Sequence, residues 1–318
     1  MTHSRAGSEY GHARPVADEI VADLSENAIM SPMYSLTRKL KTARRIYTEE
    51  GLRGAAAVLV QKLPWISFSD CIGWLKRQDA LLGRIVELTG NRVRLEACRF
   101  SVNHPAIPTW RKSLFLFNRY EIEERRAVAR VLDPELPVVE FGGSIGVVAC
   151  ITNRRLRHPG RHIVVEANGD LIPLLEQNRR RNRAGFTVLH KAVAYGTRDV
   201  LFHHDDFLSG RVQGAPGRAV RVPTVSLREI VDEFGFARCT LICDIEGEEI
   251  ELVRREKDVL HDRVATLIIE THPALSGSDA VGEMLRELEA LSFVAVFRDQ
   301  DTWALQNTRF VAAIPGSR

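Results

Sequence analysis

The chain has 318 residues, of which 45% are hydrophobic and 27% charged, an ordinary composition for a globular protein of one large or two modest domains. Its 44 Lys and Arg residues nearly balance 41 Asp and Glu residues, and the net charge of +3 gives no argument for a nucleic-acid partner. Five cysteines without a C-x-x-C spacing are typical of a reduced protein. Since neither a signal peptide nor an apolar run long enough to span a bilayer is present, we expect a cytoplasmic protein with no integral membrane segment.

The N-terminal third contains no chemical motif. Residues 1–18 are polar and are predicted to form a disordered tail. Between residues 18 and 63, apolar side chains recur at three- and four-residue steps among basic ones, which indicates amphipathic helices. These helices either lie on a membrane surface or, as we favour, pack against the main domain or a partner chain, for example in a homo-oligomer. Residues 85–100 alternate around Gly90-Asn91 and predict a β-hairpin, so residues 19–117 are expected to form an accessory region.

From residue 118 onward the pattern predicts an α/β domain that extends to residue 318. A helix over 118–132 comes first. Strands are expected at 137–142, 161–166, 186–192, 239–245 and 264–270, and helices at 144–156, 170–183, 226–235, 247–259 and 278–291. Short apolar strands alternating with helices favour a mostly parallel, Rossmann-like sheet covered on both faces. Residues 293–305 read as a terminal antiparallel hairpin, which completes the arrangement of a class I methyltransferase.

The stretch 138–146 (VVEFGGSIG) predicts a ligand-binding turn between a strand and a helix. Because residue 144 is Ser, the dinucleotide fingerprint G-x-G-x-x-G is not met. The spacing acidic-x-Gly-x-x-x-Gly is instead similar to the first motif of class I methyltransferases that use S-adenosylmethionine (SAM). That similarity implies a cofactor site made by Glu140, Gly142, Gly143, Ser144 and Gly146, with Glu140 near the aminoacyl end of SAM.

In an open parallel sheet, ligands bind outside the carboxyl ends of the strands, so the strand ends give further candidates. Glu166 ends the second strand and is predicted to accept hydrogen bonds from both ribose hydroxyls of a nucleoside; the alternative is a Glu that caps the next helix. Ala192, after the third strand, is a candidate for lining an adenine slot.

The fourth and fifth strands end in candidate catalytic groups. Asp244 and Glu246 precede Gly247 and could act as a general base, position a hydroxyl, bind a metal or pair with a sulfonium, whereas Glu248 and Glu249 fit acids at a helix N-terminus. His272 follows the fifth strand as a further candidate. The run 203–206 (HHDD) has the composition of a metal site but lacks a second ligand cluster, so we favour a surface loop and predict no metal.

As a set, these motifs resemble the FkbM-type SAM-dependent methyltransferases over residues 118–300. The resemblance is carried by Tyr120-Glu121, VVEFGGSIG, VVEANGD with Asn178 and Asn182, KAVAYG, VPTVSLREIV, CDIEGEE and LIIETH. It implies SAM as the cofactor and methyl transfer to a hydroxyl of a sugar, glycan or other small molecule. Asp244, Glu246 and His272 are then the candidates for taking the hydroxyl proton.

The chain departs from the family pattern at several positions. Glu140, Gly143 and Ser144 stand where the family usually has Asp, Ala and Asn, and Cys243 stands near a common Lys. A catalytically impaired SAM-binding or scaffold protein is therefore the main alternative. An NAD-dependent oxidoreductase would need G-x-G-x-x-G and a Tyr/Lys pair, and the sequence shows neither.

Overall fold

The computed structural model describes residues 79–204 and 218–310, which all belong to one compact unit. The predicted tail, the predicted amphipathic helices over 18–63 and the second half of the HHDD run (205–206) lie outside these residues. Within them, no helix is long and apolar enough to cross a membrane. The predicted domain boundary at residue 118 and the homo-oligomer stay predictions.

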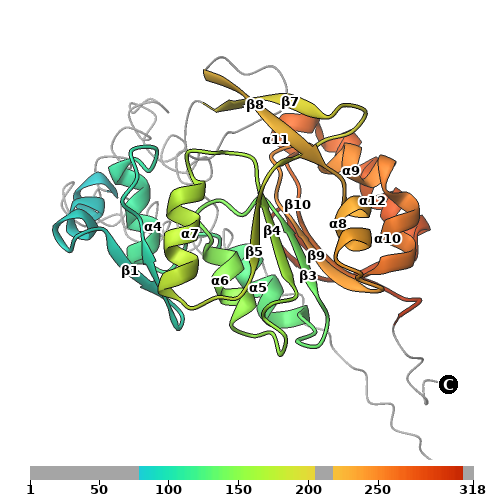
Figure 1. Cartoon of the computed structure of the whole chain (residues 1–318), viewed down its shortest axis with the longest axis horizontal. Coiled ribbons are helices and arrows are strands. Elements are labelled where there is room, and N and C mark those ends of the chain that lie inside the picture. The colour runs from blue at the N-terminus through green and yellow to red at the C-terminus, as the bar shows by residue number, and fades with distance from the viewer. Residues whose placement is uncertain (1–78, 205–217, 311–318) are drawn as a thin grey trace, which may run out of the picture. The chain divides into compact units, whose positions relative to one another are not determined.

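A seven-stranded sheet lies at the centre of the molecule (Figure 1). Its strands are β3 (Val138–Phe141), β4 (His162–Glu166), β5 (Thr187–His190), β9 (Cys239–Cys243), β10 (Val264–Glu270), β11 (Phe293–Asp299) and β12 (Thr302–Asn307). The strand order is β11-β12-β10-β9-β3-β4-β5. β12 is antiparallel to both β10 and β11, and the other neighbouring pairs are parallel. Read from β5, the first five strands follow the Rossmann order 3-2-1-4-5, and the winding reverses between β3 and β9. The predicted fold class is confirmed.

Helices cover both faces of the sheet. On one face lie α5 (Ile122–Val131), α6 (Val147–Asn153) and α7 (Ile172–Arg181); on the other lie α8 (Leu227–Glu233), α9 (Glu249–Arg255), α10 (Lys257–Arg263) and α12 (Ser278–Ala290). A helix predicted over 247–259 is thus two helices, which meet at Glu256. The Glu256 carboxylate accepts hydrogen bonds from the backbone N–H groups of Leu227 and Arg228 and so caps the N-terminus of α8.

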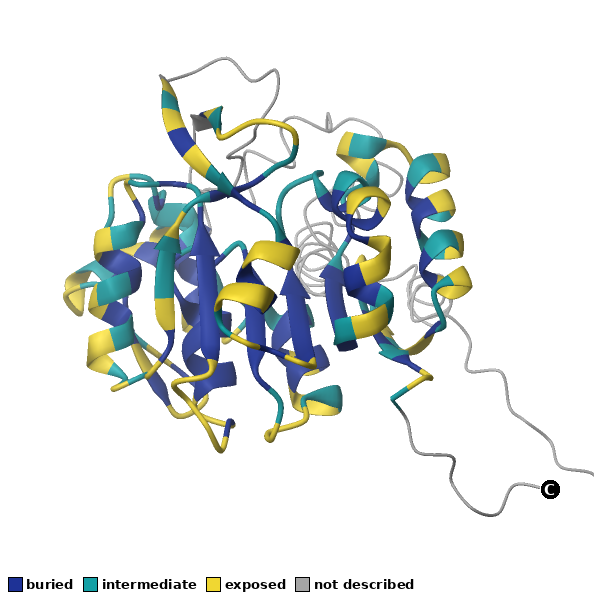
Figure 2. Cartoon of the chain, turned by 45° about the vertical axis from the view of Figure 1, so that its right-hand side comes forward, coloured by how far each residue is buried: buried dark blue, intermediate teal, exposed yellow. Residues whose placement is uncertain are grey.

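Alternation along the strands divides the core into two layers. In β3, Val139 and Phe141 pack against the α8–α12 layer, while Val138 packs against α5 and α6. Both layers consist mainly of buried apolar side chains, and the strands are dark blue in Figure 2, while the outer faces of the helices are exposed. The same alternation turns Glu140 toward the α5–α6 layer.

The N-terminal part of the described chain corrects one prediction. Residues 79–88 are helical, and the hairpin consists of β1 (Arg92–Leu95) and β2 (Cys98–Ser101), which turn at residues 96 and 97. Gly90 and Asn91, both with positive φ, end the preceding helix, since the Asn91 N–H bonds to the carbonyl of Val86. The predicted hairpin around Gly90-Asn91 was wrong because these residues also suit a helix C-terminus. A short helical segment, η1 (Thr109–Arg111) and α4 (Lys112–Leu116), then leads to α5.

A second, three-stranded sheet stands over the carboxyl ends of the central strands (Figure 1). It consists of β6 (Ala192–Val193), β8 (Arg218–Val225) and β7 (Asp199–His204) in that order. Phe202 of β7 packs with Ala192 and Val222 into a small apolar cluster that faces the sheet edge. Between α9 and α12, the short helix α11 (Pro273–Ser276) follows His272.

Candidate functional site

A cavity opens at the carboxyl edge of the central sheet, where the winding reverses, with an empty volume of about 760 Å³ that includes its mouth. Its lining comes from the ends of β3, β4 and β9, from the start of α5 and from β6 and β7: Glu121, Gly142, Ser144, Val165, Glu166, Ala167, Asn168, Leu171, Lys191, Ala192, Val193, Phe202, Asp244, Ile245, Glu246 and Glu248.

The glycine loop is held against the neighbouring strands by its backbone. The N–H groups of Gly142 and Gly143 both donate to the carbonyl of Val165 at 3.0 Å. A Cβ on Gly142 would lie 1.8 Å from the carbonyl oxygen of Asp244, so only glycine lets β3 and β9 end side by side here. A Cβ on Gly143 would lie 2.4 Å from Cγ1 of Val164, which explains why this chain has Gly where the resembling family has Ala.

Glu166 lines the cavity and also fixes the loop. One carboxylate oxygen accepts the N–H of Ser144 and the other that of Asn168, each at 2.6 Å. Burial raises the pKa of this carboxyl to about 7, against the opposing effect of these two N–H donors. Each oxygen keeps a second lone pair for a ligand donor, so the observed contacts and the predicted ribose contact are compatible.

Glu140 does not line the cavity. It is 2% exposed inside the sheet, and its Oε2 lies 3.3 Å from Nε2 of His162, which is also fully buried. Burial raises the pKa of Glu140 to about 8 and lowers that of His162 to about 3, so both side chains are neutral at pH 7. The contact of Glu140 with a cofactor stays a prediction, since this residue does not line the cavity; Gly143 and Gly146 likewise support the loop without lining the cavity.

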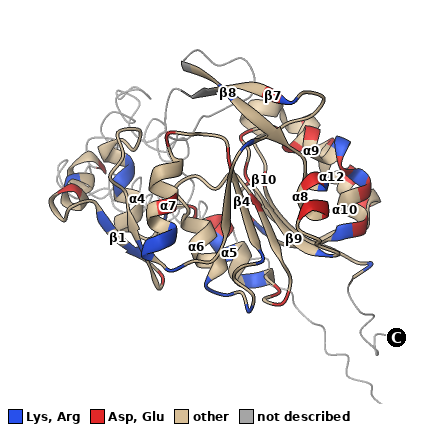
Figure 3. Ribbon diagram, in the orientation of Figure 1, with Lys and Arg blue, Asp and Glu red and all other residues tan. Residues whose placement is uncertain are grey.

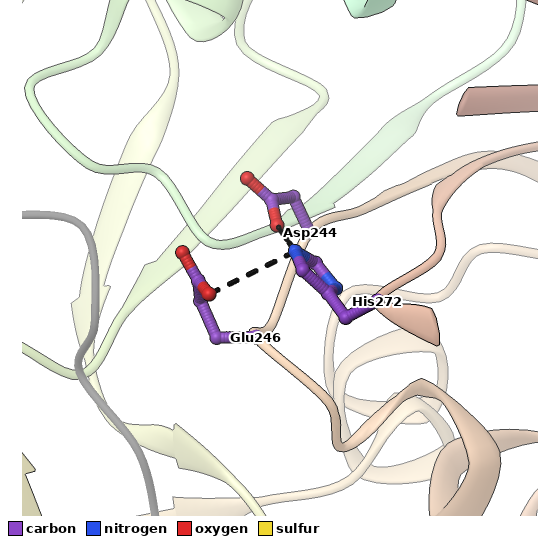
Figure 4. Close-up of side chains that lie close together, drawn as sticks. All are labelled: Asp244, Glu246 and His272. Atoms are coloured by element: carbon purple, nitrogen blue, oxygen red, sulfur yellow. Dashed lines mark ion pairs between the residues drawn. The ribbon is translucent and has the colours of Figure 1, made fainter. Parts of the chain in front are cut away.

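The three sequence-predicted catalytic candidates come together at the β9 end (Figure 4). Nε2 of His272 lies 3.5 Å from Oδ1 of Asp244 and 3.8 Å from Oε2 of Glu246. Nδ1 of His272 contacts Oε1 of Glu249 at 3.1 Å, and Glu249 in turn accepts the N–H groups of Ile245 and Gly247. Asp244 and Glu246 line the cavity, whereas His272 does not. The histidine thus joins two cavity carboxylates to a buried one.

These contacts set the protonation of the group. Burial alone would lower the pKa of His272, but the hydrogen bond with Glu249 and the charges of Asp244 and Glu246 raise it to about 9. Burial raises the pKa of Asp244 to about 6, and the neighbouring His272 limits that rise. At pH 7–8 the arrangement is therefore an imidazolium beside a carboxylate, and the carboxylate is the group able to accept a proton.

Three lining residues other than glycine hold a left-handed backbone: Glu121, Ser144 and Glu246, with φ of 50°, 46° and 54°. Such conformations cost energy and gather at functional sites. Glu121 was not among the predicted site residues, although the Tyr120-Glu121 pair carried part of the resemblance. Burial, with a smaller effect from the neighbouring Asp244 and Glu140, raises the pKa of the Glu121 carboxyl to about 8. The αL conformation that brings Glu121 to the cavity has no signal in the sequence.

The opposite end of the cavity is apolar. Ala192, Val193 and Phe202 line it from the three-stranded sheet, and Val165 and Leu171 from β4 and the start of α7. Phe202 was missed by sequence reasoning because it lies in a strand that pairs only with β8. Lys191 is the one Lys or Arg side chain among the described lining residues.

Comparisons with known proteins indicate distant structural likeness. No family model matches the chain, and no curated protein matches its sequence. Among solved structures, it is similar to a ribosomal protein L11 methylase from Lactobacillus delbrueckii (11% identity, 59% of this chain and 78% of that one, TM-score 0.36). It is also similar to a precorrin-6y C5,15-methyltransferase from Geobacter metallireducens (12%, 57% and 84%, 0.34) and to Aeropyrum pernix fibrillarin with bound S-adenosyl-L-methionine (11%, 57% and 71%, 0.35). At these identities and TM-scores the likenesses assign neither reaction nor substrate.

Proposed function

We propose that this protein is a SAM-dependent methyltransferase that transfers the methyl group to a hydroxyl oxygen of a sugar, glycan or other small hydroxylated molecule. The observation that carries the proposal is the order of groups along the cavity. The sheet order β9-β3-β4-β5 puts the carboxylates Asp244 and Glu246 at one end, Gly142 and Ser144 next, then Glu166, and the apolar β6–β7 side last.

That order matches the chemistry of SAM from one end to the other. The ammonium and sulfonium charges suit the carboxylates of Glu121, Asp244 and Glu246. The ribose hydroxyls suit Glu166, and a flat adenine suits the apolar walls at Ala192 and Phe202. When bound, SAM supplies an already activated methyl group, so the protein has mainly to align acceptor and cofactor and to accept one proton.

Asp244 is the proposed proton acceptor. It lines the cavity, and its pKa near 6 leaves it ionised at neutral pH. Glu246 lines the cavity beside it and binds or orients the acceptor hydroxyl. His272 is a positioning residue, because it contacts both carboxylates from outside the cavity and its charge stabilises their ionised forms. With SAM bound, methyl transfer would break its methyl–sulfur bond as the C–O bond forms, S-adenosylhomocysteine would leave as the neutral thioether, and Asp244 would take the hydroxyl proton.

The first test is calorimetric titration of the full chain with SAM and, separately, with NAD. Glu166→Gln keeps one acceptor oxygen but removes the negative charge that strengthens the hydrogen bonds from the two loop N–H groups and from the ribose. It is expected to weaken SAM binding about tenfold, or ~1.4 kcal/mol. Glu176→Gln on the outer surface of α7 is the matched control. NAD binding without SAM binding contradicts the proposal.

The acceptor requires a separate screen. Transfer of labelled methyl from SAM to monosaccharides, oligosaccharides and phenols is expected in the wild type and is expected to fall at least a hundredfold in Asp244→Asn. An RNA arm belongs in the screen, since the expectation of no nucleic-acid partner rests on net charge alone. SAM binding with no transfer to any class supports the scaffold alternative.

A further inference from the structure

Three carboxyl groups converge behind the cavity, and among the described residues only Asp244 has an ion-pair partner, His272. Oxygen atoms of Glu124 on α5, Asp244 at the end of β9 and Glu270 at the end of β10 all lie within 4.8 Å of one another. Of the three, only Asp244 lines the cavity. α5 packs across β10 and β12, which brings Glu124 to the sheet edge from the helix layer.

Glu124 is the unexpected member of this group. It is 5% exposed and lies on the stripe of α5 that also carries Ala127 and Val128 into the core. Among the described residues it has no hydrogen-bond partner and no cationic partner. Burial raises the pKa of this carboxyl well above its ordinary value, so without a compensating cation or donors it takes up a proton.

Asp244 is compensated only in part. Its Oδ1 is buried and accepts no hydrogen bond within the described structure, and its ion-pair contact with Nε2 of His272 is 3.5 Å long. The side chain of Glu270 has no hydrogen bond or ion pair with any described residue. Two strands of the sheet and one helix therefore direct carboxyl oxygen atoms without hydrogen bonds at one point, where a neighbouring Lys or Arg would be expected if the role were structural.

We infer that Glu124, Asp244 and Glu270 form a binding site for one divalent cation of the magnesium or manganese type. All three ligands are carboxylate oxygens, and no Cys or His belongs to the set, which favours a hard cation over zinc. A Mg²⁺ ion keeps several bound waters and usually binds through one or two carboxylates, so three carboxyl groups at one point supply enough protein ligands.

A second trio, Asp244, Glu246 and His272, is also close enough to hold a metal. It is the poorer choice, because Nε2 of His272 already lies against Asp244 and Glu246 and Nδ1 of that ring is held by Glu249, so both nitrogens of the imidazole are engaged. Asp244 belongs to both groups. Because a metal ligand has to be deprotonated, a cation in the proposed site competes with a proton for the Asp244 carboxylate.

The inference does not depend on the proposed function, and its test needs no SAM. The full chain, freed of metal with a chelator and dialysed, is titrated with Mn²⁺ while electron paramagnetic resonance reports the free ion. One bound Mn²⁺ per chain is expected, displaced by excess Mg²⁺. Glu124→Gln and Glu270→Gln are each expected to weaken Mn²⁺ binding at least tenfold, whereas Glu283→Gln, exposed on α12, leaves it unchanged.

Two outcomes overturn the site. One is a Kd for Mn²⁺ weaker than about 1 mM, the weakest range for oxygen-ligated sites. The other is unchanged Mn²⁺ binding in both Glu124→Gln and Glu270→Gln. A loss confined to Glu246→Gln would move the metal to the histidine trio and overturn the assignment. Thermal melting checks that each variant is folded; the partly exposed Glu270 keeps the test available if the buried Glu124 variant fails to fold.

Discussion

At the residue scale, strain in the cavity wall is concentrated at a few backbone positions. Ser144 has φ of 46°, and its hydroxyl lies 3.1 Å from that of Tyr120, which fixes the side chain while the N–H is held by Glu166. Asn, usual here in the resembling family, tolerates this conformation better than Ser. The loop of this chain is therefore maintained by contacts more than by intrinsic preference.

Gly142 is the position where these contacts leave no room. We expect Gly142→Ala to lower the free energy of unfolding by roughly 2–5 kcal/mol, from left-handed strain and overpacking against the Asp244 carbonyl. Gly196→Ala is the matched control, because Gly196 also has positive φ but a Cβ there meets nothing within 4 Å; its cost should be about 1–2 kcal/mol. Urea unfolding measures both, and equal losses would show that the close approach of β3 and β9 does not matter.

His272 should make stability depend on pH. Its folded pKa of about 9 lies above the ordinary 6.5, so the stability it contributes is fully present below pH 6.5 and is lost as the pH rises through 9. With a side chain only 15% exposed, the loss is roughly 2–3 kcal/mol between these limits. His272→Gln should flatten the decline seen by urea unfolding at pH 6, 7.5 and 9, and His158→Gln, on an exposed side chain, should not. A parallel decline in wild type and His272→Gln contradicts this assignment.

At the element scale, α7 is joined to the hairpin by two asparagines one turn apart. Asn178 accepts the N–H of Ser101 at 2.7 Å and donates to the carbonyls of Ser101 and Ile145. Asn182 repeats the pattern on Arg99, nearer the surface. Alternate residues of β2 thus bond to residues i and i+4 of a helix, and Asn178 also holds the start of α6 behind the glycine loop.

The two asparagines form a natural comparison. Asn178→Ala should cost about 3–5 kcal/mol, because it leaves three buried backbone groups without partners. Asn182→Ala should cost about 1 kcal/mol, since water can replace its bonds to Arg99. Chemical unfolding followed by circular dichroism gives both values. Similar costs for the two variants would mean that the hairpin is not part of the cooperative core.

Most helices and strands could be predicted from the spacing of apolar residues and from segment length, because buried parallel strands and their crossover helices have distinct patterns. Turns and helix ends were predicted less well. Gly90-Asn91 fits both a hairpin and a helix end, and Glu256 lies between two helices where its side chain caps α8, which is distant in sequence. At the site, Glu166, Asp244 and Glu246 were predictable because strand ends meet at one edge. The buried position of Glu140 and the approach of Glu121 and Glu124 depend on how α5 packs, which local sequence does not encode.

At the scale of the whole molecule, basic and acidic side chains gather in different places. Basic side chains gather on the hairpin and the end of α7, while acidic side chains are found at the carboxyl edge of the sheet and, mixed with basic ones, on α8–α12 (Figure 3). Arg94 and Arg99 lie directly opposite each other on the exposed face of the hairpin, so their like charges repel. The acidic interior selects for a positively charged ligand although the net charge of the chain is +3.

The cavity joins both halves of the sheet and the three-stranded sheet, so a ligand that fills it should stabilise the described unit as a whole. At a SAM concentration of 100 times its Kd, the free energy of unfolding should rise by about 2.7 kcal/mol. At the same SAM concentration Glu166→Gln, if it binds tenfold more weakly, should gain only about 1.4 kcal/mol. Differential scanning calorimetry with SAM, NAD or no ligand measures these gains, and NAD should give none.

Because SAM is a cation held by carboxylates, its effect should also weaken as salt is raised from 0.05 to about 0.5 M. A gain that is equal for SAM and NAD, or insensitive to Glu166→Gln, would show that the ligand does not enter this cavity in the proposed orientation.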